Sequence, residues 1–508
     1  MLIDARTLPT DAVVQADVCV VGGGPAGITL AAELLGTGNR VCVLESGGVT
    51  VEPRPQSLAR AESVGLSYYR VDATRFRALG GASHRWISAR ARPLDPLDFE
   101  ARPGVPDSGW PFDSEHLTPY YGRAHRVLGL GPFDYDAASW EKERSRLPLD
   151  PAHVVTTMFR FGPLDVVLRR RQRLVDGEDV QVYVHATAQE LVADDLGSRV
   201  AAVSVASGPA RRFTVRAQLF VLAAGGIDNP RLLLLSTGAQ PQGLGNGHDL
   251  VGRYFMEHPH TRTGMLRLQG AARHLDMSLH RRRSFPDATV QATLTPAPHV
   301  VRARSLLNST WWLRPIPAAL TSPAAAALSA FREGVTHRVR VPHALGHLRT
   351  LVSHPVDTAR CAGELAVERG RGRWLTADRA FVELRAMSEQ APNPASRVTL
   401  GRQRDHLGQR RARLDWRLTG LDRESIRAAQ GILDQAVREA GIGRVERPLG
   451  DERPPALIGG GCHHMGTTRM HPSPRRGVVD PDCRVHGWRT CSWRAARSSP
   501  PSATPIRR

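Results

Sequence analysis

The sequence contains almost no lysine. Lys142 is the single lysine among 68 basic residues, so arginine carries nearly all of the positive charge. A net charge of +19 would by itself favour a nucleic-acid or anionic-surface partner. The arginines, however, are spread along the chain in short clusters such as Arg169–Arg171 and Arg281–Arg283, and abundant Ala, Gly and Pro indicate GC-rich coding bias. We therefore expect no nucleic-acid partner.

Cysteine is also scarce, and no pair of cysteines has CxxC spacing. Six isolated cysteines predict reduced, buried or incidental thiols and exclude a disulfide framework. The sequence has no run of eighteen apolar residues and no basic segment followed by an apolar stretch at its start. We therefore expect neither a transmembrane helix nor a secretion signal, and a cytoplasmic location.

The residues that are present predict a large α/β protein. With 508 residues, of which 41% are apolar, the chain can form two or three domains. Residues 16–47 have the pattern of strand, tight turn, helix and second strand: the apolar runs Val18–Val21 and Val41–Leu44 flank a glycine turn and the helical spacing of Ile28–Leu35. This unit predicts the opening of a doubly wound parallel sheet.

Further elements follow from local patterns. We expect strands at residues 181–185, 190–193, 200–205, 213–215, 219–223, 397–400 and 411–416. A helix over 228–236 is expected to open at Asp228, and a helix over 421–440 has Asp422 as its expected N-cap. Residues 260–390 show no clear periodicity and predict only a mixture of elements.

The turn after the first strand has the composition of a dinucleotide-binding motif. Gly22 permits the tight turn, Gly24 lets the backbone approach a pyrophosphate, and Gly27 allows close packing of helix and strand. Pro25 and Ala26 complete the motif, and Glu45 at the end of the second strand can accept hydrogen bonds from ribose hydroxyls. The motif predicts NAD or FAD, and the carboxylate of Glu45 disfavours NADP.

Several further motifs resemble those of the glucose–methanol–choline (GMC) oxidoreductases, a family of FAD-dependent alcohol and sugar oxidases and dehydrogenases. The resemblance includes Gly80-Gly81-Ala82-Ser83 and the segments 223–231 and 252–259, and it is strongest at Gly461-Cys462-His463-His464-Met465-Gly466-Thr467. The branch looks closest to pyranose oxidases and bacterial sugar dehydrogenases. The resemblance implies that FAD contacts Gly80, Gly81, Ser83, Ala223 and Gly225, as well as the dinucleotide turn.

The resemblance also implies two interleaved domains. Residues 1–110, 180–260 and 455–487 would form the Rossmann-type FAD-binding domain. Residues 111–179 and 261–454 would form an α+β substrate-binding domain whose antiparallel sheet covers the flavin.

Two adjacent histidines are the candidate catalytic residues. By resemblance His463 occupies the position of the family's active-site base, with His464 as the alternative one place away. Oxidation of an alcohol needs a base for the hydroxyl proton while hydride leaves for the flavin, and histidine suits this role near neutral pH. Adjacent residues rarely reach the same metal ion, so we expect no metal site.

A covalent bond to FAD is not expected. Some relatives link FAD to a histidine that immediately precedes a tryptophan, but here Arg85 holds that place before Trp86, and His84 lies one residue earlier. The sequence thus predicts noncovalent FAD and oxidation of a CH–OH group of a sugar, glycoside or other alcohol. Oxygen, a quinone or a redox protein would reoxidise the flavin. The alternatives are a non-sugar or sterol alcohol as substrate, or a catalytically impaired flavoprotein remnant.

The last residues, 488–508, resemble nothing in the family. They are rich in Arg, Ser and Pro, where the resemblance implies a buried strand, an Asn or a second histidine that partners the catalytic histidine, and a final helix. One extra G before the Trp488 codon lets the frame be read, with permitted synonymous codons, as Val-Glu-Asp-Leu-Phe-Val-Ala-Gly and on to Tyr-Ala-Asn-Pro. We therefore hypothesise a one-base deletion, which sequencing around codon 487 tests. Loss of the buried strand would expose a sheet edge and predicts low solubility, little FAD and little activity.

Overall fold

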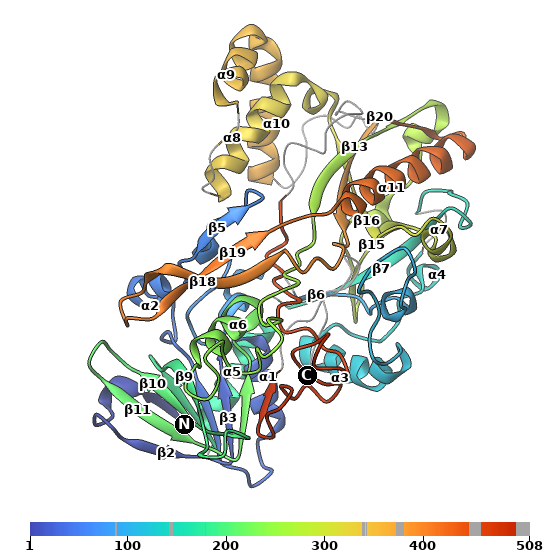
Figure 1. Cartoon of the computed structure of the whole chain (residues 1–508). Helices are drawn as coiled ribbons and strands as arrows, with labels where there is room; N and C mark the ends of the chain where they lie inside the picture. Colours follow the sequence, from blue (N-terminus) through green and yellow to red (C-terminus); the bar gives the residue numbers. More distant parts are fainter. Residues whose placement is uncertain are drawn as a thin grey trace.

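A computed structural model of the chain shows a two-part α/β architecture (Figure 1). The structure describes residues 1–86, 89–141, 146–163, 165–177, 179–337, 341, 343–371, 380–446 and 459–493. None of the helices in these ranges combines the length and hydrophobicity needed to cross a bilayer. The predicted fold class, a Rossmann-type part interleaved with a part that carries an antiparallel sheet, is confirmed.

The first part is built on a parallel sheet of six strands. Their order is β1 (Leu2–Asp4), β8 (Val180–Val184), β4 (Val41–Leu44), β3 (Val18–Val21), β12 (Leu219–Leu222) and β21 (Cys491–Trp493). Successive side chains of β3 point to opposite faces, so both faces of the sheet need cover. Val20 packs with Ile28 of α1 (Pro25–Glu33) and Leu174 of α5 (Val166–Asp176) on one face.

A second, smaller sheet covers the opposite face. Its four strands are β2 (Val13–Gln15), β11 (Arg212–Arg216), β10 (Val200–Ala206) and β9 (Thr187–Ala193). Cys19 and Val21 of β3 share a buried cluster with Val203 and Phe213 from this sheet, and α6 (Gly225–Leu235) closes the same cluster. Three layers therefore surround the dinucleotide turn and fix its position at the ends of β3 and β4.

The second part is an antiparallel sheet of eight strands. Its strands are β20 (Gly443–Glu446), β13 (His260–Leu268), β17 (Phe381–Ser388), β16 (Ser309–Ile316), β15 (Thr289–Pro296), β7 (Val154–Gly162) and β6 (Ala89–Ala91), with β14 (Arg283–Ser284) beside β15. Helix α11 (Gly420–Glu439) packs on one face, where Trp311 is buried against Leu433. The next residue, Trp312, points to the other face and lines a cavity. We call this sheet the roof sheet.

The remaining elements lie around these layers. A three-stranded sheet contains β18 (Arg397–Arg404), β19 (Arg410–Trp416) and β5 (Glu62–Gly65). The other helices are α2 (Pro53–Gln56), α3 (Thr118–Leu128), α4 (Ala137–Trp140), α7 (Pro298–Ala303), α8 (Pro323–His337), α9 (Ala344–Ser353) and α10 (Pro355–Arg371). Helices α8, α9 and α10 form an outlying group at the top of Figure 1.

Several placements differ from the sequence-based expectations. Helix α6 begins at Gly225 and not at Asp228, and the N-cap of α11 is Thr419, while Asp422 completes its capping box from the third position. Strand β6 lies within the range 1–110 but belongs to the roof sheet. Helix α5 lies within 111–179 but packs on the parallel sheet. The domain ranges are therefore interleaved more finely than we expected.

The segment after Gly487 also corrects an expectation. Residues 491–493 form β21, parallel to β12, and the side chains of Trp488 and Cys491 are buried in the core beside the parallel sheet. The expected loss of the strand next to β12 is therefore wrong, and β21 is the last strand of the sheet on that side. The expectation of low solubility and little FAD stays a prediction. Residues 494–508 lie outside the described residues.

Candidate functional site

A large cavity of about 990 Å³ lies between the dinucleotide turn and the roof sheet. Ten of the residues singled out from the sequence line it: Gly22, Gly24, Pro25, Ala26, Glu45, Gly81, Ala223, Gly225, His463 and His464. The structure thus brings the glycine turn, the segment after β12 and the histidine pair together around one space. Gly27, Gly80 and Ser83 lie behind this lining and shape it indirectly.

The geometry of the glycine turn depends on two positions that have no room for a side chain. Gly22 has φ +115°, and a Cβ there would lie 2.6 Å from the carbonyl oxygen of Ala223. A Cβ on Gly27 would lie 1.9 Å from the carbonyl oxygen of Gly22. A Cβ on Gly24, in contrast, would meet no atom within 4 Å. The turn is therefore packed tightly against the strands but open on the side of the cavity.

This open side fits the pyrophosphate of a dinucleotide. Gly24 is the N-cap of α1 and supplies no side-chain hydrogen bond, so backbone N–H groups at the helix start remain available to an anion. Glu45 and the histidine pair line the same cavity as this turn. The residues present therefore fit FAD.

The loop at Gly80–Trp86 is hydrogen-bonded to the glycine turn. The N–H of Gly80 donates to the carbonyl oxygen of Gly23 at 2.8 Å, and Ser83 Oγ donates to the carbonyl oxygen of Gly80 at 2.7 Å. Ser83 is thus a loop-forming residue that does not line the cavity. His84 Nε2 lies 3.0 Å from the carbonyl oxygen of Leu79, and His84 is likewise not part of the cavity lining, whereas Trp86 is.

Glu45 lines the cavity at the end of β4 and is almost fully buried. Its two carboxylate oxygens accept backbone N–H groups, from Gly23 at 3.1 Å and from Gly47 at 2.8 Å. Burial raises the pKa of Glu45, and the hydrogen bond from Gly47 opposes this shift. These contacts fix the orientation of the carboxylate, as recognition of a ribose would require.

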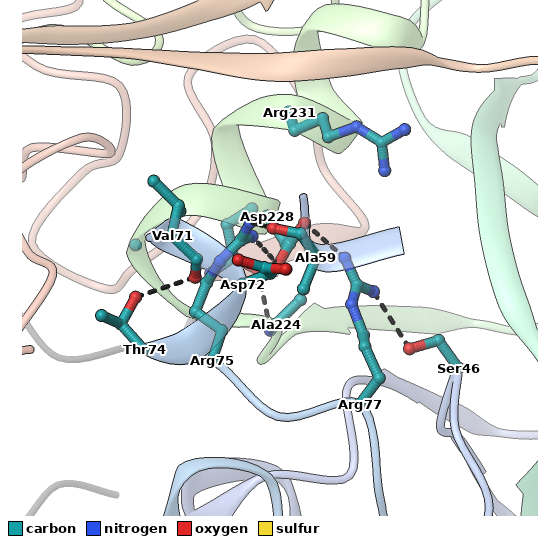
Figure 2. A network of polar contacts seen from close by, with 12 residues as sticks. Ser46, Ala59, Val71, Asp72, Thr74, Arg75, Arg77, Ala224, Asp228 and Arg231 are labelled. Atoms are coloured by element: carbon teal, nitrogen blue, oxygen red, sulfur yellow. Dashed lines mark hydrogen bonds and ion pairs between the residues drawn. The ribbon is translucent and has the colours of Figure 1, made fainter. Parts of the chain in front are cut away.

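A cluster of arginines around Asp228 lines the cavity and was not predicted as a site (Figure 2). Asp228 accepts hydrogen bonds from Arg75 and from Arg77, the latter at 2.6 Å, and Arg77 also donates to Ser46 Oγ at 3.0 Å. Burial would raise the pKa of Asp228, but the neighbouring guanidinium groups lower it to about 2. The cluster therefore joins the start of α6 to Ser46, just after β4, and keeps net positive charge beside the cavity.

His464 is held in a buried hydrogen-bonded chain. Its Nε2 lies 2.9 Å from the hydroxyl of Tyr68, and that hydroxyl donates to the carboxylate of Glu257. Glu257 also accepts the backbone N–H of Gly461 at 2.8 Å and of His258 at 3.1 Å. Burial raises the pKa of Glu257 to about 7 despite these hydrogen bonds. The chain ties the loop 461–464 to the segment that precedes β13.

His463 has a different environment. It is partly accessible in the cavity, and its Nδ1 has no hydrogen-bond partner among the described residues. Its ring meets that of His258 edge to face, with 4.8 Å between ring centroids. Burial, followed by the charge of Arg90, lowers the pKa of His463 to about 4. Its imidazole is therefore neutral at neutral pH and can accept a proton.

The sequence did not single out Tyr68, Glu257, His258 or Arg90 as site residues. Glu257 and His258 entered the sequence analysis only as part of the motif 252–259. The Glu-His pair before Pro259 was nevertheless a signal that polar side chains lie near the start of a strand. Within the described ranges, no group of three or more His, Cys, Asp or Glu side chains has an arrangement that could hold a metal ion.

The buried histidines predict acid sensitivity. Burial lowers the pKa of His464 to about 3 and that of His280 to about 4, from about 6.5 in the unfolded chain. Between the folded and the unfolded pKa values, the unfolded chain binds more protons than the folded chain, so the free energy of unfolding falls as the pH falls. At pH 5.5 each histidine is expected to lower the free energy of unfolding by about 1 kcal/mol relative to pH 7.5. The raised pKa of Glu257 offsets part of this loss.

Thermal unfolding at pH 7.5 and 5.5 measures this loss as a lower Tm in acid. His280→Leu is the matched variant, because His280 lies outside the cavity lining, and it should reduce the difference between the two pH values. A Tm that does not fall on acidification would contradict the expectation.

Comparisons with known proteins agree with this geometry. A family model described as GMC oxidoreductase matches residues 392–491, and one described as FAD binding domain matches residues 15–62. The chain is 24% identical over 312 residues to 2-methyl-1,2-propanediol dehydrogenase of Mycolicibacterium austroafricanum, covering 48% of this chain and 55% of the relative. It is 26% identical over 226 residues to the fructose dehydrogenase large subunit of Gluconobacter japonicus, covering 36% and 41%. The chain thus spans about half the length of the curated relatives it matches, or less.

Two solved structures share the fold. Pyridoxine 4-oxidase from Mesorbium loti has a TM-score of 0.51 at 17% identity, with 96% of each chain covered. Formate oxidase has a TM-score of 0.50 at 15% identity, covering 98% of this chain and 96% of that chain. The family models and the curated relatives support a GMC-family FAD oxidoreductase: residues 392–491 match the GMC oxidoreductase model, residues 15–62 match the FAD binding domain, and the cofactor is FAD.

Proposed function

We propose that this protein oxidises a CH–OH group of a sugar, glycoside or other alcohol, with His463 as the base that takes the hydroxyl proton. The observation that carries the proposal is the position of His463: its partly exposed side chain lines the cavity that starts at the dinucleotide turn, whereas His464 is buried. When bound, FAD supplies the hydride acceptor. The names of the curated relatives, a diol dehydrogenase and a fructose dehydrogenase subunit, support an alcohol or sugar as donor.

His464 is the less suitable base. Its Nε2 already contacts the hydroxyl of Tyr68, and the proton of that hydroxyl is directed to Glu257. In our proposal, His464 and Glu257 position the loop that carries His463. His258, whose pKa is lowered well below its ordinary value by burial and by the neighbouring His463, stays neutral and packs against the base.

We further propose that FAD is held without a covalent bond. His84 lies outside the cavity lining and its Nε2 contacts a backbone carbonyl, which supports this proposal. Acid precipitation tests it: all flavin should appear in the supernatant, and flavin in the pellet would contradict noncovalent binding.

The test of the reaction is anaerobic mixing of the yellow protein with candidate sugars and with aliphatic and sterol alcohols. Bleaching of the flavin by a sugar supports the proposal, and bleaching only by the other alcohols selects the non-sugar alternative. Absence of bleaching by every alcohol would overturn the proposed function. Readmission of oxygen, or addition of a quinone, then identifies the acceptor that restores the colour.

A further inference from the structure

Two arginines extend from the roof sheet and its neighbouring loop into the cavity. Arg90 lies on β6 and pairs in register with Phe161 of β7, and Arg282 precedes β14. Both line the cavity, together with Gln291 and Trp312 of the roof sheet. The guanidinium carbon of Arg90 lies 4.8 Å from the centroid of the Trp312 ring, and that of Arg282 lies 4.1 Å from the Phe161 ring. Aromatic faces therefore hold both cations in place.

Arg90 has no acidic partner among the described residues, and the acids of the cavity are occupied elsewhere. The acids in the cavity lining are Glu33, Glu45 and Asp228. Glu33 pairs with Arg123 and lies 3.8 Å from Arg170, and Asp228 pairs with Arg75 and Arg77. Glu45 accepts backbone N–H groups. Burial lowers the pKa of Arg90 to about 10, and the charge of Arg282 adds to this shift. A largely buried cation without an acidic partner, such as Arg90, is unfavourable unless an anion joins it.

The positive charge of Arg90 also affects the histidines around the proposed reaction centre. The charge of Arg90 contributes to the lowered pKa of His463, His258 and His260, after the larger effect of burial. Arg90 therefore lies close to the base and on the side of the roof sheet. The pyrophosphate of FAD would lie at the start of α1, so it would not neutralise Arg90.

We propose that Arg90, with Arg282, binds an anionic oxygen group of the substrate, so that the protein acts on a hydroxylated compound that also carries a carboxylate or a phosphate. A guanidinium group offers two parallel N–H donors to either group. The anion would hold the substrate by its charged end and leave a hydroxyl at His463. This inference rests on the proposed function for the reaction, but the binding of the anion can be measured separately.

Titration calorimetry on the FAD-loaded full chain tests the anion site. The ligands are glucuronate and gluconate as carboxylates, glucose 6-phosphate as the phosphate, and glucose as the neutral reference. We expect at least one anion to bind about 10-fold or more tightly than glucose. Arg90→Gln should weaken that anion by about 10- to 100-fold, the loss expected for a charge-assisted hydrogen bond, and change glucose binding by less than about 2-fold. Arg90→Lys should bind the anion more tightly than Arg90→Gln does but less tightly than the unchanged protein, because lysine keeps the charge but lacks the two parallel N–H donors.

Arg212→Gln is the matched control, because Arg212 is exposed on β11 and lies outside the cavity lining. It should leave every affinity unchanged. Equal binding of glucose and all anions, no binding of any anion, or an equal loss of glucose and anion in Arg90→Gln would overturn the inference. The carboxylate and phosphate arms show which anion the site prefers.

Anaerobic flavin bleaching with the same four compounds separates the two proposals. If neutral alcohols bleach the flavin and anions have no advantage, the anion site is wrong and the proposed function stands. If an anion binds through Arg90 but no alcohol bleaches the flavin, the anion site stands and the proposed function is wrong.

Discussion

Replacement of His463 by asparagine is expected to slow the reduction of the flavin by an alcohol by about 10²- to 10⁴-fold, the usual contribution of a general base. The imidazole is neutral above about pH 4 and its partly exposed ring lines the cavity, whereas an asparagine amide cannot take up a proton. The change removes no hydrogen bond that the structure gives to the side chain. FAD content and Tm should therefore stay close to those of the unchanged protein.

The measurement is single-turnover bleaching under anaerobic conditions at saturating alcohol. His464→Asn is the matched control, since its side chain contacts Tyr68 in the chain that ends at Glu257. We expect this variant to lower the Tm and to slow bleaching less than His463→Asn does. The reverse order, with His464→Asn nearly inactive and His463→Asn nearly normal, would assign the base to His464.

The pH dependence of the same rate provides a second check on the base. The rate should stay level from neutral pH downward and fall only near pH 4, where His463 becomes protonated. A fall centred near 6.5, the ordinary pKa of histidine, would mean that the base is better hydrated than the buried ring of His463.

The nucleotide-binding unit could be predicted because its signals are local. The strands at Val18–Val21 and Val41–Leu44 were found with the correct bounds, since both are short apolar runs buried on both faces of a parallel sheet. The glycine turn lies between them in sequence and in space. A strand, its turn and the next helix need no knowledge of distant residues.

Helix starts were less predictable because several residues can cap one helix. Asp422 was expected as the N-cap of α11, but Thr419 caps it, and both side chains take part in one capping box. Helix α6 starts at Gly225, where φ is +84° and the sequence shows only a glycine turn. The sequence analysis recognised the capping side chain of Asp422 at α11, but it placed the N-cap one turn too late.

The roof sheet could not be read because its strands pair across long stretches of chain. Strand β13 pairs with β17, more than a hundred residues later, and β6 pairs with β7 across α3 and α4. Arg90 and Glu257 thus gain their roles from partners that are distant in sequence. The histidine pair was found through a resemblance and not through a local pattern, which explains why its neighbours Tyr68 and His258 were missed.

The substitution Gly24→Ala is expected to remove most of the bound FAD while leaving the fold intact. Gly24 has φ −81°, a value that alanine adopts readily, and a Cβ there meets no protein atom within 4 Å. The methyl group would instead project into the space in which we place the pyrophosphate. Crowding of this kind costs about 1–3 kcal/mol, so FAD affinity should fall by about 10- to 100-fold.

Two further alanine variants separate loss of the ligand from loss of the fold. Gly27→Ala places a Cβ 1.9 Å from the carbonyl oxygen of Gly22 and should lower the Tm as well as the FAD content. Gly431→Ala lies within α11 with no atom within 4 Å of its Cβ and should affect neither, or raise the Tm slightly. FAD titration and thermal unfolding of the apoprotein give both quantities. If Gly24→Ala bound FAD as tightly as the unchanged protein, the pyrophosphate could not lie against the start of α1. The position of every other group along the cavity would then have to be reconsidered, because the order from Glu45 to His463 depends on that anchor.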